Sequence, residues 1–174
     1  LFRDFWQRLH AAPDAPDAEV LYLSRQNDSL RDELPELYKD VPPVFELARE
    51  VFGNMPDAVN IWIGDGRAVS SCHKDFYENI FVVVRGEKVF TLLPPAAVPF
   101  LHEQPCNPAA YARSASGKLK VVPDGPDVAA VPWVPVDVAK PDLERFPDMA
   151  HAPSIEVRVK SGEALYLPAM WYHQ

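Results

Sequence analysis

His73 and Asp75 lie two residues apart, and this pairing of an imidazole with a carboxylate is the strongest chemical signal in the chain. On an extended strand, residues i and i+2 point to the same face, so one strand could present both groups to a single metal ion. His173, near the other end of the chain, could supply a second imidazole if the fold brings the two segments together. Two imidazoles and one carboxylate on one face of a metal leave coordination positions open, which suits non-haem Fe(II) oxygenases.

A solvated surface turn is the alternative interpretation of His73 and Asp75, and the short spacing alone favours it. Other polar residues of the chain favour the metal site over this alternative. Lys88 could anchor the distal carboxylate of a 2-oxoglutarate cosubstrate through a charge-assisted hydrogen bond, although an exposed strand lysine is the alternative. Three further residues could bond that carboxylate or a metal ligand, namely Tyr22, Ser70 and Asn79. Taken singly, these three are ordinary core, turn and strand-end residues.

Cys72 directly precedes His73 and could be mistaken for a metal ligand. On a strand it would point to the opposite face, so we interpret it as a small buried residue. The chain has two cysteines, Cys72 and Cys106, which is too few for a disulfide framework. This favours a reducing compartment, and we expect the protein in the cytoplasm, with the nucleus left open as a second location.

The composition indicates one domain with a sizeable core, because 48% of the 174 residues are hydrophobic. The net charge of −8 argues against a general nucleic-acid binder or a binder of anionic membranes, and it suits either a basic partner or plain solubility. No apolar run approaches the roughly 20 residues that span a bilayer. The first residue is not Met, so we expect a single-domain fragment, 1–174, truncated at both ends.

The residue pattern predicts short strands with helices near the N-terminus. Apolar spacing predicts helices over 2–9 and 43–52, the second ending at Gly53. Strands are predicted over 19–23, 59–63, 69–75, 79–84, 88–93, 155–159, 164–167 and from 171 onward. Arg85-Gly86-Glu87 predicts a hairpin between two of these strands, and the Pro-rich segment 96–153 predicts a long irregular insertion. The fold class is therefore mainly β: a double-stranded β-helix, or cupin-like jelly roll, with flanking N-terminal helices.

Aromatic residues cluster in sequence around these positions. A wall of aromatic side chains could exclude water from a reactive metal centre. The alternative, which we expect for most of them, is that they belong to the core of the β fold. The residues in question are Trp62, Tyr77, Phe81, Tyr166, Trp171 and Tyr172.

From about Tyr22 to His173, the chain resembles the JmjC branch of the 2-oxoglutarate oxygenases. The resemblance is carried by residues 60–64, 73–79, 86–88, 132–135 and 162–173. In the last stretch a strand, a proline and an aromatic-x-His run follow one another, which is typical of the distal iron ligand of this family. The resemblance implies a cupin-like fold that uses Fe(II), 2-oxoglutarate and O2. It assigns the iron to His73, Asp75 and His173, and the 2-oxoglutarate pocket to Lys88, Tyr22, Ser70 and Asn79.

The segments His73–Asn79 and Pro132–Pro135 are most similar to family members that are lysyl (3S)-hydroxylases of GTP-binding proteins. Ser70 stands where the family often has Thr, which keeps the hydroxyl, and Phe81 replaces a Tyr. The resemblance implies a protein substrate, with a lysine in a GTP-binding protein as the expected target, and leaves a homodimer open. The alternatives are asparaginyl, histidyl or tRNA-base hydroxylation, lysine demethylation, or a cupin-like binding module without turnover. Demethylases usually carry Glu where this chain has Asp75.

Overall fold

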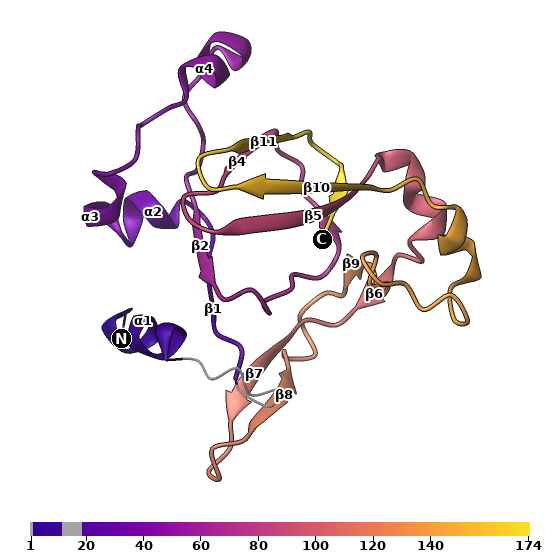
Figure 1. Ribbon diagram of the computed structural model, residues 1–174. Helices are drawn as coiled ribbons and strands as arrows, with labels where there is room; N and C mark the ends of the chain where they lie inside the picture. Colours follow the sequence, from indigo (N-terminus) through magenta and orange to yellow (C-terminus); the bar gives the residue numbers. More distant parts are fainter. Residues whose placement is uncertain (1, 12–18) are drawn as a thin grey trace. The chain divides into compact units, whose positions relative to one another are not determined.

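The computed structural model describes residues 2–11 and 19–174 (Figure 1). They form an N-terminal unit, Leu1–Val69, and a C-terminal unit, Ser70–Gln174. Within the described residues, no helix is both long and apolar enough to cross a membrane. The predicted mainly β fold with N-terminal helices is confirmed, since most elements are strands and their pairs are antiparallel.

The N-terminal unit combines short helices with one antiparallel strand pair, β1 with β2. Its elements are α1 (Phe2–His10), β1 (Tyr22–Arg25), α2 (Ser29–Asp32), α3 (Pro35–Tyr38), α4 (Glu46–Phe52) and β2 (Ile61–Gly64). The helix predicted over 2–9 is confirmed. The helix predicted over 43–52 begins only at Glu46, because Phe45 is still extended at its N-cap. Gly53 ends it in the left-handed region (φ 74°), as a C-terminal glycine should.

The C-terminal unit contains a four-stranded sheet in the order β10-β5-β12-β3 and a two-stranded sheet, β11-β4 (Figure 1). The strands of the four-stranded sheet are β3 (His73–Lys74), β5 (Glu87–Leu93), β10 (Ile155–Lys160) and β12 (Tyr172–His173). The smaller sheet consists of β4 (Asn79–Val82) and β11 (Ala164–Leu167). The strands nearest the candidate metal ligands thus come from both ends of this unit.

The predicted hairpin around Gly86 is wrong. β4 pairs with β11, whereas β5 pairs with β10 and β12. Segments 79–92 and 155–167 therefore run antiparallel as one long ribbon, which passes from one sheet to the other where Gly86 and Gly162 adopt positive φ. Backbone bonds from Gly162 to Val83 and from Ser161 to Gly86 continue the pairing through this bend. A turn signal in the sequence does not show whether the chain reverses or crosses to a second sheet.

The segment 96–153 is more regular than predicted. It contains two 3₁₀ helices, η1 (Pro95–Phe100) and η2 (Pro147–His151), and four strands. The strands form two ribbons: β6 (Gln104–Cys106) with β9 (Val131–Trp133), and β7 (Ala109–Arg113) with β8 (Leu119–Pro123). Pro105 and Pro132 face each other in the first ribbon. Proline cannot donate to a ladder but is tolerated in edge strands, so its presence concealed these strands from a pattern-based prediction.

The four-stranded sheet separates two apolar cores. One core lies between it and β11-β4 and comprises Val83, Phe90, Leu92, Val159 and Leu167. The other core packs Cys72, Leu93 and Tyr172 against residues of the 96–153 segment, including Leu101, Val134 and Met149. We call these the inter-sheet core and the insertion core. Successive residues of β5 and β12 alternate between them, as the two-residue period of a strand requires.

We expect Gly64→Ala to destabilise the N-terminal unit. A β-carbon at Gly64 would lie 2.5 Å from Cδ2 of Tyr22, the residue paired with it across the β1-β2 ladder. Relieving that overlap by moving the ring should cost about 1–3 kcal/mol. Thermal unfolding would measure it. Gly66→Ala is the matched control, because a β-carbon there meets nothing within 4 Å. Equal melting temperatures for the two variants would contradict the expected overlap.

Candidate metal centre

His73 and His173 face each other directly across the β3-β12 ladder. Their ring centroids are 4.3 Å apart, and Nε2 of His173 lies 3.8 Å from Oδ2 of Asp75. One ligand atom from each of the three residues lies within 4.8 Å of the other two. Metal–imidazole bonds are about 2.0–2.1 Å long, so one ion fits between these donors. The pairing of two strands far apart in sequence thus creates the cluster predicted from the spacing.

Backbone carbonyls orient both imidazoles. Nδ1 of His73 lies 2.7 Å from the carbonyl oxygen of Ser71, and Nδ1 of His173 lies 3.1 Å from that of Trp171. In each case Nδ1–H donates to the carbonyl two residues earlier. Nε2 is then the unprotonated nitrogen with a free lone pair, which is the tautomer that metal ligation requires.

Asp75 lies just beyond the end of β3 rather than within it. The strand predicted over 69–75 is correct only for His73 and Lys74. The carbonyl of Asp75 accepts a 2.7 Å hydrogen bond from the amide of Met170, in the turn before β12. Asp75 is half-exposed, whereas the His173 side chain is 10% exposed. The metal donors therefore lie at an edge of the sheet, with one imidazole on the protein side and the carboxylate on the solvent side.

Burial lowers the pKa of His173, and electrostatic interactions with His73 and Lys88 lower it further, against the opposing effects of the hydrogen bond to the Trp171 carbonyl and of Asp75. His173 thus stays neutral to a lower pH than a free imidazole. A neutral ring is the form that binds a metal, so protons compete less with the metal at this residue.

Lys88 and Asn79 face the inter-sheet core from opposite sheets. On β5, Lys88, Phe90 and Leu92 share one face, and Leu92 is paired with His173. Lys88 is partly buried, and this burial lowers its pKa. Asn79 is paired with the buried Leu167 on β11, so it faces the same core. Lys88 does not lie on a strand next to that of His73, because β12 lies between β5 and β3.

The two other predicted cosubstrate residues lie outside these sheets. Tyr22 is in β1 of the N-terminal unit, with its ring over Gly64. Ser70 is partly buried and precedes β3 without belonging to a strand. Their assignment to the cosubstrate remains a prediction.

The aromatic residues considered for a wall around the metal belong mostly to the apolar cores or to the surface. Tyr77 is 70% exposed and Tyr166 is 51% exposed. Tyr172 faces the insertion core, whereas Phe81 and Trp171 pack against the inter-sheet core. The aromatic ring that does accompany the metal donors is Trp133 of β9, which is parallel to His73 within 2° at a centroid distance of 6.3 Å. The sequence analysis included the segment Pro132–Pro135 in the family resemblance but gave Trp133 no role.

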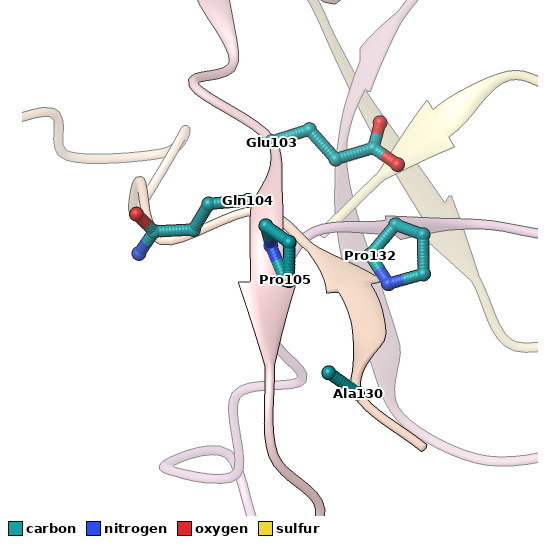
Figure 2. Close-up of a pocket in the computed structure, with 5 residues that line it drawn as sticks. All are labelled: Glu103, Gln104, Pro105, Ala130 and Pro132. Carbon is teal, nitrogen blue, oxygen red and sulfur yellow. The ribbon is translucent and has the colours of Figure 1, made fainter.

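The ribbon that carries Trp133 also forms a pocket of about 270 Å³ (Figure 2). Glu103, Gln104, Pro105, Ala130 and Pro132 line it. Figure 2 shows the Glu103 carboxylate and the Gln104 amide pointing to opposite sides of the ribbon. Glu103 is bonded to Lys74 and Tyr172, each the sequence neighbour of a metal donor. This contact also escaped the sequence analysis, because no local pattern connects position 103 with 74 or 172.

Comparison with known proteins places the chain in a family. The sequence model of the cupin-like domain matches residues 1–174. The chain is 45% identical over 154 residues to the bifunctional peptidase and (3S)-lysyl hydroxylase JMJD7 of Homo sapiens, covering 88% of this chain and 48% of that protein. It is 38% identical to JmjC domain-containing protein E of Dictyostelium discoideum (88% and 46% covered). It is 42% identical to lysine-specific demethylase JMJ32 of Arabidopsis thaliana (89% and 47% covered).

The chain belongs to the cupin-like family, on the branch of the JmjC-domain proteins. The oxygenases of this branch use Fe(II) and 2-oxoglutarate, and the described donor set fits such an ion: two oriented imidazoles and one carboxylate. The chain spans about half the length of the curated relatives it matches.

We expect Cys72 to resist alkylation in the folded protein. Burial raises the pKa of its thiol to about 12, so roughly one molecule in 3,000 carries the thiolate at pH 8.5. The thiolate is the reactive form. Iodoacetamide labelling followed by peptide mass spectrometry should show Cys72 reacting at least about ten times more slowly than the partly buried Cys106. Labelling in denaturant is the control and should remove the difference. Equal rates in the folded protein would contradict the buried placement of Cys72.

Proposed function

We propose that residues 1–174 act as the catalytic domain of an Fe(II)- and 2-oxoglutarate-dependent protein hydroxylase, with lysine as the residue that is modified. The observation that carries this proposal is the position of His73, Asp75 and His173, whose donor atoms lie within 4.8 Å of one another. Both imidazoles offer Nε2 because a carbonyl holds Nδ1. The similarity to a (3S)-lysyl hydroxylase supports the choice of reaction and residue.

These three residues would hold the metal ion. Fe(II) with bound 2-oxoglutarate supplies the activation of O2. In the overall reaction a substrate C–H bond becomes C–OH, while 2-oxoglutarate is oxidised to succinate and CO2. One oxygen atom enters the alcohol and the other enters succinate. The protein would contribute donors of fixed orientation and a cationic anchor, and the buried Phe90 and Leu92 lie on the same face of β5 as that anchor.

Lys88 is proposed to bind the distal carboxylate of 2-oxoglutarate, with Asn79, Tyr22 and Ser70 as further polar contacts. Two observations support Lys88. Its ammonium is partly buried on the face of the sheet that carries His173, and its charge acts on that histidine. Asn79 approaches the same core from β4. A desolvated cation binds a carboxylate more strongly than an exposed one does.

A lysine in a GTP-binding protein is proposed as the substrate, in the cytoplasm and with the nucleus as a second location. The net charge of −8 supports a basic target, because a negative protein attracts cationic segments. Hydroxylation at carbon is proposed rather than demethylation at nitrogen, because the chain is 45% identical to a (3S)-lysyl hydroxylase. Demethylation is the second candidate, since a relative of similar identity is named a lysine-specific demethylase. The complete donor set argues against a binding module without turnover.

We expect Lys88→Ala to raise the KM for 2-oxoglutarate by about 100-fold or more, because breaking a buried charged pair costs about 3–5 kcal/mol. Succinate formation at varied 2-oxoglutarate measures it. Lys160→Ala, an exposed lysine on the neighbouring strand β10, is the matched control and should leave KM unchanged. A KM within twofold of the unsubstituted value for Lys88→Ala would remove Lys88 from the cosubstrate site.

We expect the chain, loaded with Fe(II) and 2-oxoglutarate, to add one oxygen atom to lysine in peptides of a GTP-binding protein. Peptide mass spectrometry with fragmentation locates the added mass on the side chain. His73→Ala should abolish the product, which separates enzymatic from adventitious oxidation. A formaldehyde assay on methyl-lysine peptides tests the second candidate. Formaldehyde release without any hydroxylated product from unmodified lysine would establish demethylation instead.

A further inference from the structure

Lys74 and Tyr172 form the cross-strand pair next to the pair of metal-donor histidines. His73 faces His173 across the β3-β12 ladder, and Lys74 faces Tyr172 one residue along. Because alternate residues of a strand point to opposite faces, Lys74 and Tyr172 lie on the reverse side of the same two strands. The proposed metal donors and this pair therefore share one piece of backbone.

Glu103 joins Lys74 and Tyr172 into a closed network. Nζ of Lys74 donates to the hydroxyl oxygen of Tyr172 at 2.7 Å and to both carboxylate oxygens of Glu103 at 3.0 and 3.2 Å. The Tyr172 hydroxyl donates to Glu103 at 2.6 Å. The Tyr172 residue is only 2% exposed, and the side chains of Lys74 and Glu103 are 23% and 20% exposed. The partial burial strengthens these charge-assisted bonds, and loss of one partner would leave a charge without its counterpart.

Backbone pairing alone holds β3 weakly. β3 has two residues and forms an edge of the sheet, and within the described part of the chain it pairs with β12 alone. Short ladders of this kind open easily unless side chains support them. The network supplies this support, because it links β3 to β12 and to Glu103 immediately before β6. A displacement of β3 that would separate His73 from His173 would also break these bonds.

We propose that Lys74, Glu103 and Tyr172 are positioning residues for the metal centre. They fix the separation of the two histidine donors from the reverse side of the strands, without contacting the metal. The inference rests on the proposed function in one respect, the binding of a divalent ion by His73, Asp75 and His173. Residues that orient metal ligands typically contribute about 10–100-fold to metal affinity.

The experiment measures Co²⁺ binding to the 174-residue chain by visible absorption, together with thermal unfolding of the metal-free protein. The main variant is Tyr172→Phe, which removes one hydroxyl and keeps the ring in the insertion core. Glu103→Gln is the second variant, which keeps the side-chain shape and removes the charge. Arg158→Met is the matched control, because Arg158 lies on β10, the opposite edge strand of the same sheet, and forms exposed ion pairs with Glu87 of β5 and Glu156 of β10. His73→Ala removes a proposed donor and therefore measures how much Co²⁺ binds elsewhere on the chain.

We expect Tyr172→Phe and Glu103→Gln to raise the Kd for Co²⁺ at least about tenfold and to change its absorption spectrum, while Arg158→Met changes neither. Binding is measured well below the melting temperature of each variant, so a purely stabilising role would lower the melting temperature and leave Kd and spectrum unchanged. That result, with Co²⁺ still bound by the unsubstituted chain and lost in His73→Ala, would overturn the positioning role and leave the metal centre intact. Failure of the unsubstituted chain to bind Co²⁺ would overturn the metal centre, and the positioning role with it.

Discussion

The antiparallel contact between β12 and β3 is the constraint on which the candidate site depends. Two residue pairs bring His173 opposite His73 and Tyr172 opposite Lys74. β12 is held from both sides, because it also pairs with Leu92 and Leu93 of β5. Thr91 of β5 then exchanges two backbone hydrogen bonds with Gln174. The short outer strand is thus aligned by a central strand that is itself fixed in the sheet.

The two faces of the four-stranded sheet carry residues of different kinds. One face presents the histidine donors, Lys88 and the apolar residues of the inter-sheet core. The other face buries Tyr172 and Cys72 in the insertion core. Segment 96–153 contributes to both tasks: it covers the reverse face and brings Trp133 parallel to the ring of His73. A segment that reads as an irregular insertion is therefore part of the structure that surrounds the candidate site.

The sequence was sufficient to predict the fold class and the residues that cluster at the candidate metal centre, because both depend on local signals. Alternating apolar residues indicated the strands. The His-x-Asp spacing suggested two donors, and the resemblance to the JmjC oxygenases, which includes the terminal aromatic-x-His, assigned all three. The pairing of the strands could not be predicted in this way. Gly86 has the same local signature whether the chain reverses in a hairpin or crosses to a second sheet. Glu103 meets Lys74 and Tyr172 through contacts that span 29 and 69 residues, and no local pattern encodes such distances.

The two-faced character of β12 restricts its register against β3 and β5. His173 belongs to the metal side and Tyr172 to the insertion core because of their parity along the strand. A slip of β12 by one residue against β3 and β5 would exchange the two side chains, placing a phenol among the donors and an imidazole in an apolar core. A slip of two residues would preserve the alternation but would move His173 away from His73. Homologous chains that keep the site should therefore keep this register, with any difference in length between Pro168 and Trp171 confined to the turn itself.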